Sequence, residues 1–151
     1  MKTNILTLLA VLALGLTRSF GHGDVELGPG GGRILEFSKN ESMHGEVTVK
    51  GGKFHIAVLD KDMKPVALEK QVLTATSGDR EKPEKLAVEK ADGRFVVPQL
   101  KGGDYWIIFQ FKLTPDAKPI TARLHYDEAL CPKCKKGEWL CVCHEDEEKK
   151  K

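Results

Sequence analysis

The feature that most constrains the fold is a two-residue alternation of apolar and polar side chains between Gly32 and Asp127. Glycine, proline and aspartate interrupt this alternation about every 8–12 residues. The pattern predicts an antiparallel all-β domain, because successive side chains of a strand point to opposite faces of a sheet. The expected strands are residues 33–37, 44–50, 53–59, 66–76, 84–90, 94–98, 104–112 and 119–126.

Two short turns support this prediction. Gly51-Gly52 and Asp92-Gly93 each stand between strand-like segments, and glycine readily adopts the positive φ that two-residue hairpin turns require. The segment 104–112 carries apolar residues on both faces, which predicts a central strand covered on both sides. Seven or eight short strands in about 95 residues indicate an immunoglobulin-like antiparallel β-sandwich.

The glycine turn also fixes where the histidines of this hairpin point. It places Val47 opposite Ile56 on the core face, so His44 and His55 project from the opposite, polar face. These two histidines lie about 13 Å apart along the strands, too far to share one metal ion. His125 alternates with apolar neighbours and also faces outward. Since no nucleophile or carboxylate partner can be assigned to any of them, we do not expect an enzyme.

The N-terminus has the pattern of a secretory signal peptide. Lys2 precedes an apolar run over residues 5–16, and the small residues Ser19 and Gly21 follow, which predicts cleavage after Gly21. The run is shorter than the roughly 20 apolar residues of a membrane-spanning helix. We therefore expect a periplasmic or secreted protein that begins at His22 and has no membrane span.

Four regions are expected along the chain. They are a signal peptide (1–21), a β-sandwich domain (22–127), a Cys-rich segment (128–144) and a disordered charged tail (145–151). Removal of the signal peptide leaves 22 basic and 22 acidic residues. A chain with no net charge offers no electrostatic reason to bind nucleic acid or an anionic membrane surface.

The Cys-rich segment is the first candidate site. A C-x-x-C pair is followed, after six intervening residues, by C-x-C-H. The candidate metal ligands are Cys131, Cys134, Cys141, Cys143 and His144. A C-x-x-C turn places two thiolates on one side of a tight loop, as structural zinc sites do, and so dense a set of soft sulfur ligands also suits copper as Cu(I).

Two other fates of these cysteines remain open. Exported cysteines normally form disulfides, and four cysteines allow three pairings. A redox-active C-x-x-C is the third possibility, although that motif belongs at a strand-to-helix junction, which is not expected here.

The mature N-terminus is a second candidate metal site. If cleavage leaves His22 first, its α-amine and ring nitrogen can chelate one metal as a bidentate unit. A further imidazole, from His125 or His44, would complete a nitrogen site of the type that Cu(II) favours, if the N-terminal segment packs across a strand end. The alternative is a frayed terminus with no bound ligand.

Two stretches resemble metal-handling proteins of the bacterial periplasm. The segment Gly28-Pro29-Gly30-Gly31-Gly32-Arg33-Ile34-Leu35-Glu36, with the hairpin that ends in Phe54-His55-Ile56-Ala57-Val58-Leu59, resembles the small β-domain of heavy-metal efflux adaptors of RND-type pumps. The family's motif has histidine or asparagine at the position where this chain has Gly30. This resemblance implies a β-domain and a metal efflux system as partner.

A second resemblance concerns the last expected strand. Asp116-Ala117-Lys118-Pro119-Ile120-Thr121 is similar to the D-x-H-P-I-T motif of periplasmic copper-resistance proteins of the CopC type. That family is an immunoglobulin-like sandwich with an N-terminal histidine ligand. Lys118 stands where the motif has a second histidine, so the resemblance implies the fold and a copper-related setting.

Two functions follow from these patterns. The first is an exported metal-binding module linked to heavy-metal or copper handling, with a metal efflux system or another periplasmic protein as partner. The alternative is a disulfide-stapled structural or protein-interaction β-sandwich with no bound metal. The number of free thiols separates the two.

Overall fold

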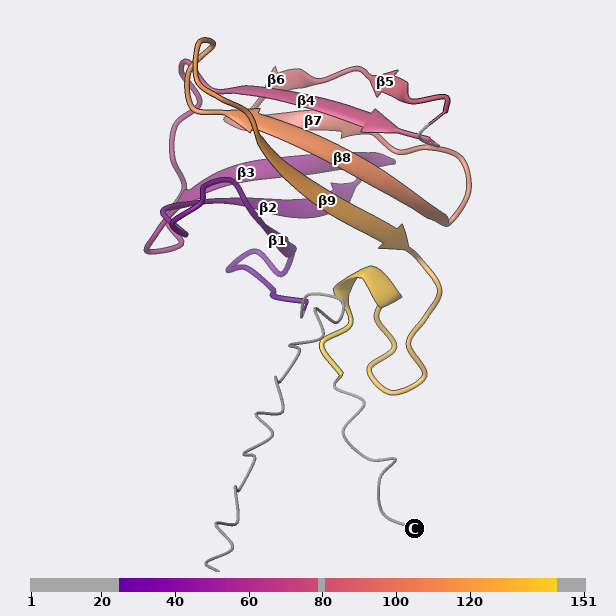
Figure 1. Cartoon of the computed structure of the whole chain (residues 1–151). Coiled ribbons are helices and arrows are strands. Elements are labelled where there is room, and N and C mark those ends of the chain that lie inside the picture. The colour runs from indigo at the N-terminus through magenta and orange to yellow at the C-terminus, as the bar shows by residue number, and fades with distance from the viewer. Residues whose placement is uncertain (1–24, 79–80, 144–151) are drawn as a thin grey trace, which may run out of the picture.

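The computed structural model describes residues 25–78 and 81–143, which form two antiparallel β-sheets packed face to face (Figure 1). The all-β sandwich expected from the alternation is therefore confirmed. The predicted signal peptide (1–21) and charged tail (145–151) lie outside the described residues.

Nine strands are present in the described part of the chain. They are β1 (Arg33–Glu36), β2 (Met43–Lys50), β3 (Lys53–Asp60), β4 (Val72–Ser77), β5 (Glu84–Leu86), β6 (Glu89–Ala91), β7 (Arg94–Pro98), β8 (Asp104–Lys112) and β9 (Ile120–Asp127). The first sheet has the order β1-β2-β3-β7-β6, and the second has the order β5-β4-β8-β9. The chain crosses between the sheets after β3, β5 and β7, so each connection contributes to holding the two layers together.

The predicted hairpin register is confirmed. Val47 pairs with Ile56 in the β2–β3 ladder. Gly51 and Gly52 both have positive φ, at 59° and 71°, which makes this the turn type whose twist matches that of the flanking strands. The β6–β7 connection uses Asp92 and Gly93 in the same way, with φ of 51° and 70°.

The core lies between the two sheets. Its largest fully buried side chains are Phe54, Phe95, Phe109, Phe111, Ile56, Leu59, Ile107, Leu124, Val47, Val58 and Val97. Phe37 and Phe111 stack with ring centroids 4.6 Å apart and join the first sheet to the second. Each such side chain contributes roughly 1.5–3 kcal/mol by leaving water, so this layer supplies most of the favourable free energy of folding.

The strand expected over 66–76 begins later, at Val72. The buried side chain of Gln71 replaces sheet pairing just before it. Its Nε2 donates to the carbonyl of Ala67 over 3.2 Å, and its Oε1 accepts from the backbone N–H of Glu69 over 2.7 Å. These local bonds satisfy backbone groups that a ladder would otherwise pair.

The single strand expected over 84–90 is two strands in different sheets. β5 pairs with β4, and β6 pairs with β7. Alternation alone did not show that the chain changes sheets between Leu86 and Glu89.

The prediction that 104–112 is covered on both sides was wrong for one face. β8 is central, between β4 and β9, and Ile107, Phe109 and Phe111 are buried in the core. On the outer face, however, Trp106 is 49% exposed.

Candidate metal centre

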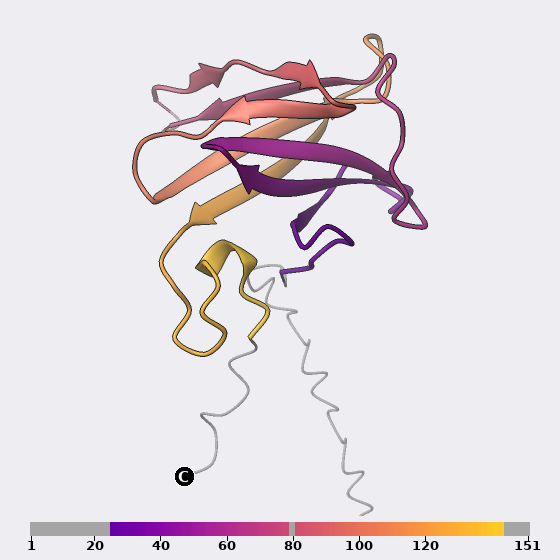
Figure 2. The same cartoon turned by 180° about the vertical axis from the view of Figure 1, so that it is seen from behind.

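The Cys-rich segment follows β9 directly and folds back against the sandwich. Figures 1 and 2 both show this yellow segment below the end of β9 and beside the indigo N-terminal loop. Arg33, the first residue of β1, donates from Nη1 to the carbonyl of Trp139 over 3.2 Å. Burial lowers the pKa of the Arg33 guanidinium. The two ends of the described chain therefore meet at one end of the sandwich.

The first cysteine pair sits in a tight loop. A bridge between Leu130 and Gly137 closes this loop. Inside it, the N–H of Cys131 donates to the carbonyl of Lys136 over 2.8 Å, and the N–H of Lys135 donates to the carbonyl of Cys131 over 2.9 Å. Lys135 has a φ of 60°, which reverses the chain directly after Cys134. Both thiols of the C-x-x-C pair are therefore held by backbone geometry.

The second cysteine pair is brought back by one turn of 3₁₀ helix, η1 (Glu138–Leu140). The N–H of Cys141 donates to the carbonyl of Glu138 over 3.1 Å and ends this turn. The N–H of Cys143 then points at the sulfur of Cys141, 3.4 Å away. The C-x-C segment therefore curves around the sulfur of Cys141.

Trp139 anchors the segment to the core. Its side chain is only 7% exposed and belongs to the main hydrophobic cluster. The ring lies 5.3 Å from that of Tyr126 on β9. Cys131 is also buried, whereas the other three cysteines are half-buried. The cysteine cluster is therefore fixed to the sandwich on one side and open to solvent on the other.

The four sulfur atoms of Cys131, Cys134, Cys141 and Cys143 lie within 4.8 Å of one another. The sulfurs of Cys134 and Cys141 are 3.8 Å apart. A tetrahedron with Zn–S bonds of about 2.3 Å has sulfur–sulfur edges of about 3.8 Å. The cluster can hold a metal ion, and a small contraction of its longest edge would complete such a tetrahedron.

All four cysteines lie in the described part of the chain, and all four are free thiols. The separation of 3.8 Å between Cys134 and Cys141 is well above the roughly 2.05 Å of a disulfide bond. The structure therefore presents the cysteines as four separate ligands and not as two disulfides.

The hydrogen bonds of the cluster favour ionisation of Cys131 before that of Cys141 and Cys143. Backbone N–H groups of Cys134 and Lys133, with the Cys141 side chain, lower the pKa of Cys131 to about 7. The backbone N–H of Cys143 lowers the pKa of Cys141, but the hydrogen bond with Cys131 and desolvation outweigh it and raise that pKa to about 12. Hydrogen bonds from Cys134 chiefly raise the pKa of Cys143. A cation in the centre would remove the mutual repulsion that keeps the later thiols protonated.

Two of the other predicted ligands, both histidines, lie among the described residues. His144 and His22 lie outside the described residues. His125 faces outward as predicted, where its ring stacks on Trp106 at 4.5 Å and its Nε2 lies 2.7 Å from Oδ1 of Asp104. In residues 25–78 and 81–143, the four cysteines form the single group of three or more metal-ligating side chains, and His125 is not part of it.

His44 lies on the face opposite Val47, as the predicted register requires, but it is not an exposed polar side chain there. Its side chain is buried, and Nδ1 lies 2.9 Å from Oε1 of Glu36. Glu46, on the same face, is buried beneath the glycine-rich loop. Its Oε1 accepts from the N–H groups of Gly30 and Gly32 over 2.7 and 3.1 Å. The loop before β1 thus folds across the outer face of the first sheet.

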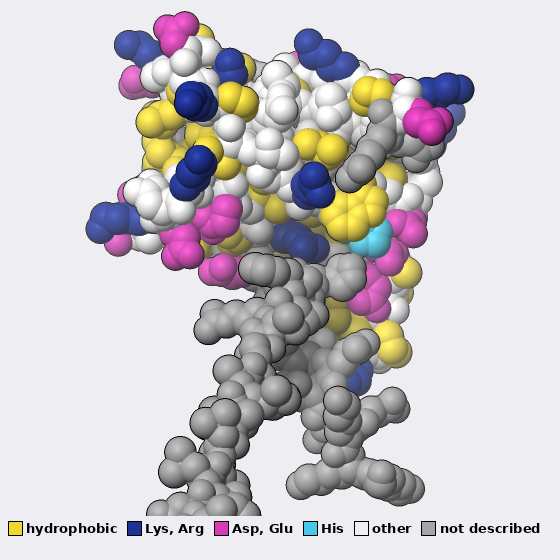
Figure 3. Space-filling model, in the orientation of Figure 1, with side chains coloured by type: hydrophobic (Ala, Val, Ile, Leu, Met, Phe, Trp, Pro, Cys, Tyr) yellow, Lys and Arg dark blue, Asp and Glu magenta, His cyan; other side chains and the backbone are white. Residues whose placement is uncertain are grey.

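The surface carries basic and acidic side chains in a mixed arrangement on the face seen in Figure 3, with no large area of one sign. Among the described residues, no helix is of a length and hydrophobicity that would cross a membrane. Comparison with family models, curated proteins and solved structures found no match to this chain.

Proposed function

We propose that this chain is an exported metal-binding module that holds one thiophilic ion, zinc in the first place, through Cys131, Cys134, Cys141 and Cys143. The observation that carries the proposal is the convergence of four free sulfurs within 4.8 Å. Four thiolates in a closed tetrahedral set are typical of a structural zinc site. Copper as Cu(I) is the competing ion, because soft thiolates also suit it.

The metal has a structural task in this arrangement. Zinc would tie the loop that contains Cys131 to the strand-like segment that contains Cys143, and Trp139 lies between these two arms in sequence. Because structural metal binding is coupled to local folding, the ion would hold Trp139 in the core and the Cys-rich segment against β1 and β9.

Export and a role in heavy-metal or copper handling belong to the same proposal. They are supported by the signal-like N-terminus, by the resemblance of the segment 28–36 to efflux adaptors and by the resemblance of the segment 116–121 to copper-resistance proteins. A metal efflux system is the corresponding partner.

The test is the mass of the full chain, exported and purified without added metal, under native and denaturing conditions. We expect one bound ion, which is lost on denaturation, and four titratable thiols after chelation. Cys134→Ser should abolish binding, whereas His125→Asn, which removes the second candidate site, should leave the metal content unchanged. Metal-free protein with no free thiols would instead establish the disulfide-stapled alternative.

A further inference from the structure

An open cavity of about 260 Å³ lies at the end of the sandwich away from the cysteine cluster. β9 separates the two, since Ile120 at its start lines the cavity and the Cys-rich segment follows its last residue, Asp127. Two loops frame the cavity, one between β1 and β2 and the other between β8 and β9. It is therefore distinct from the proposed metal site.

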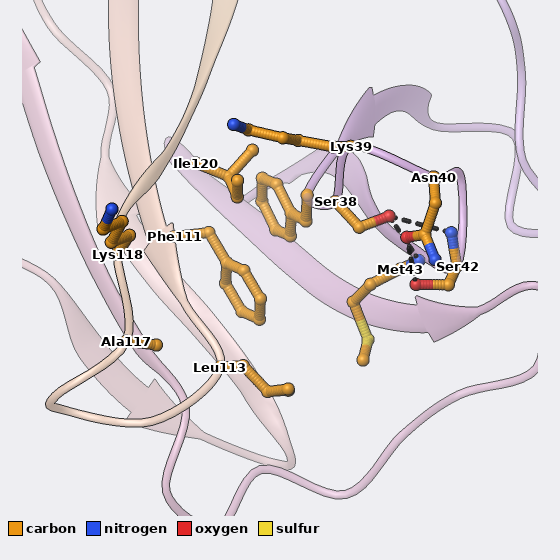
Figure 4. A pocket seen from close by; sticks show the side chains of 11 residues that line it. Ser38, Lys39, Asn40, Ser42, Met43, Phe111, Leu113, Ala117, Lys118 and Ile120 are labelled. Carbon is orange, nitrogen blue, oxygen red and sulfur yellow. Dashed lines mark hydrogen bonds between the residues drawn. The ribbon is translucent and has the colours of Figure 1, made fainter.

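The wall of this cavity is apolar. The stacked rings of Phe37 and Phe111 close its inner side. Met43 and Ile120 are half-buried along it, and Leu113 is 51% exposed. Figure 4 shows Met43, Phe111, Leu113 and Ile120 gathered around one space. Apolar surface left in water in this way gains free energy when an apolar ligand covers it.

The polar groups of the first loop mostly bind one another. Oγ of Ser38 accepts from the N–H groups of Ser42 and Met43 over 2.8 and 3.1 Å. Oγ of Ser42 donates to Oδ1 of Asn40 over 2.8 Å. The dashed lines in Figure 4 mark these bonds. They leave the loop with little capacity to recognise a sugar or a nucleotide, which would need several free donors and acceptors.

Two cations also line the cavity. Lys39 and Lys118 both line the cavity, and neither side chain makes an ion pair or hydrogen bond within residues 25–78 and 81–143. In Figure 4 the Lys39 ammonium lies above Ile120 and the Lys118 side chain lies to the left of it, on the loop before β9. The cavity thus combines an apolar wall with positive charge at one end.

We propose that this cavity binds a medium-chain aliphatic monocarboxylate. The carboxylate would lie between the ammonium groups of Lys39 and Lys118, and the chain would run over Ile120 and Phe111 toward Leu113. Because the apolar wall is bounded by Leu113, binding should stop improving once the chain spans it.

The test is a calorimetric titration of the full, metal-loaded chain with straight-chain carboxylates from butyrate to decanoate. Each added methylene should tighten binding about threefold to fourfold, until the chain spans the apolar wall and the gain ends before decanoate. The backbone amide signals of Ala117 and Ile120 should shift on binding, while those of the Cys-rich segment should not.

Charge recognition is tested separately. Lys39→Gln combined with Lys118→Gln should weaken octanoate binding about tenfold or more and leave 1-octanol binding unchanged. Lys101→Gln, in the loop between β7 and β8, is the matched control and should change neither. Leu113→Ser, at an exposed position, should weaken both ligands.

Three results would overturn the proposal. The first is binding that still tightens at decanoate, as a detergent would bind. The second is equal affinity for octylamine and octanoate, and the third is unchanged amide signals at Ala117 and Ile120. None of them bears on the cysteine cluster, so the two proposals fail independently.

Discussion

Arg33 and Trp139, which are 106 positions apart in sequence, are joined by a hydrogen bond of 3.2 Å from the guanidinium Nη1 to the backbone carbonyl. This bond ties the first strand of the sandwich to the turn that carries the second cysteine pair. Because Trp139 is itself buried in the core, the Cys-rich segment is an integral part of the domain. The geometry of the cysteine cluster therefore depends on the sandwich.

Removal of this bond should loosen the segment. In metal-free protein, Arg33→Gln should accelerate hydrogen exchange at the Leu140 and Cys141 amides about threefold to tenfold, since one hydrogen bond contributes about 0.5–1.5 kcal/mol. The exposed Arg123→Gln on β9 is the control. Equal exchange rates in the two variants would show that Trp139 alone holds the segment.

The thiols should titrate in separate steps. In metal-free protein, thiolate absorbance should show one step near pH 7 from Cys131, whereas Cys141 should ionise only near pH 12. Because the pKa of Cys131 lies below its ordinary 9.0, its ionisation stabilises the fold fully above pH 9, and this stabilisation is lost as the pH falls through 7. The raised pKa of Cys141 has the opposite pH dependence. Its protonated thiol stabilises the fold fully below pH 9, and this stabilisation is lost as the pH rises toward 12. Cys131→Ser should remove the first step, and its persistence would assign that step to another cysteine.

Much of the fold was predictable because short turns fix register. Once the Gly51-Gly52 turn is recognised, the pairing of Val47 with Ile56 follows from the two-residue period. The burial of His44 and Glu46 was not predictable in this way. Alternation tells which side chains share a face, but it does not show that the glycine-rich loop covers Glu46 or that Glu36 pairs with His44.

The candidate metal site was likewise only partly predictable from the sequence. The C-x-x-C and C-x-C spacings were sufficient to predict that four cysteines could share one ion. The docking of the segment was missed, although the sequence carries a signal for it. Trp139 and Leu140 are apolar residues between the two cysteine pairs in an otherwise charged stretch, and such a pair has to be buried somewhere.

The close approach of the glycine-rich loop to β2 should make Gly32 intolerant of a side chain. A Cβ there would lie 2.4 Å from the carbonyl oxygen of Val47, so Gly32→Ala should lower the free energy of unfolding by about 1–3 kcal/mol. Gly31 is the matched control. Its φ is +76° with open space around it, and asparagine accepts that conformation, so Gly31→Asn should have little effect. Urea unfolding at a fixed metal concentration measures both, and similar losses would show that the loop does not pack as described.

The buried carboxylate of Glu46 holds the glycine-rich loop against β2. Glu46→Ala would leave the N–H groups of Gly30 and Gly32 without their acceptor, at a cost of about 2–4 kcal/mol in unfolding free energy. The exposed Glu89→Ala on β6 should cost little.

A double-mutant cycle in the same urea assay would show whether the loop is built around this carboxylate. A Cβ at Gly30 would lie 3.0 Å from both carboxylate oxygens of Glu46, so Gly30→Ala should destabilise the wild-type chain. In the Glu46→Ala background the same change should be nearly neutral, because the atoms it crowds are gone. Strictly additive effects of the two changes would contradict this account, since residues that do not touch show no coupling.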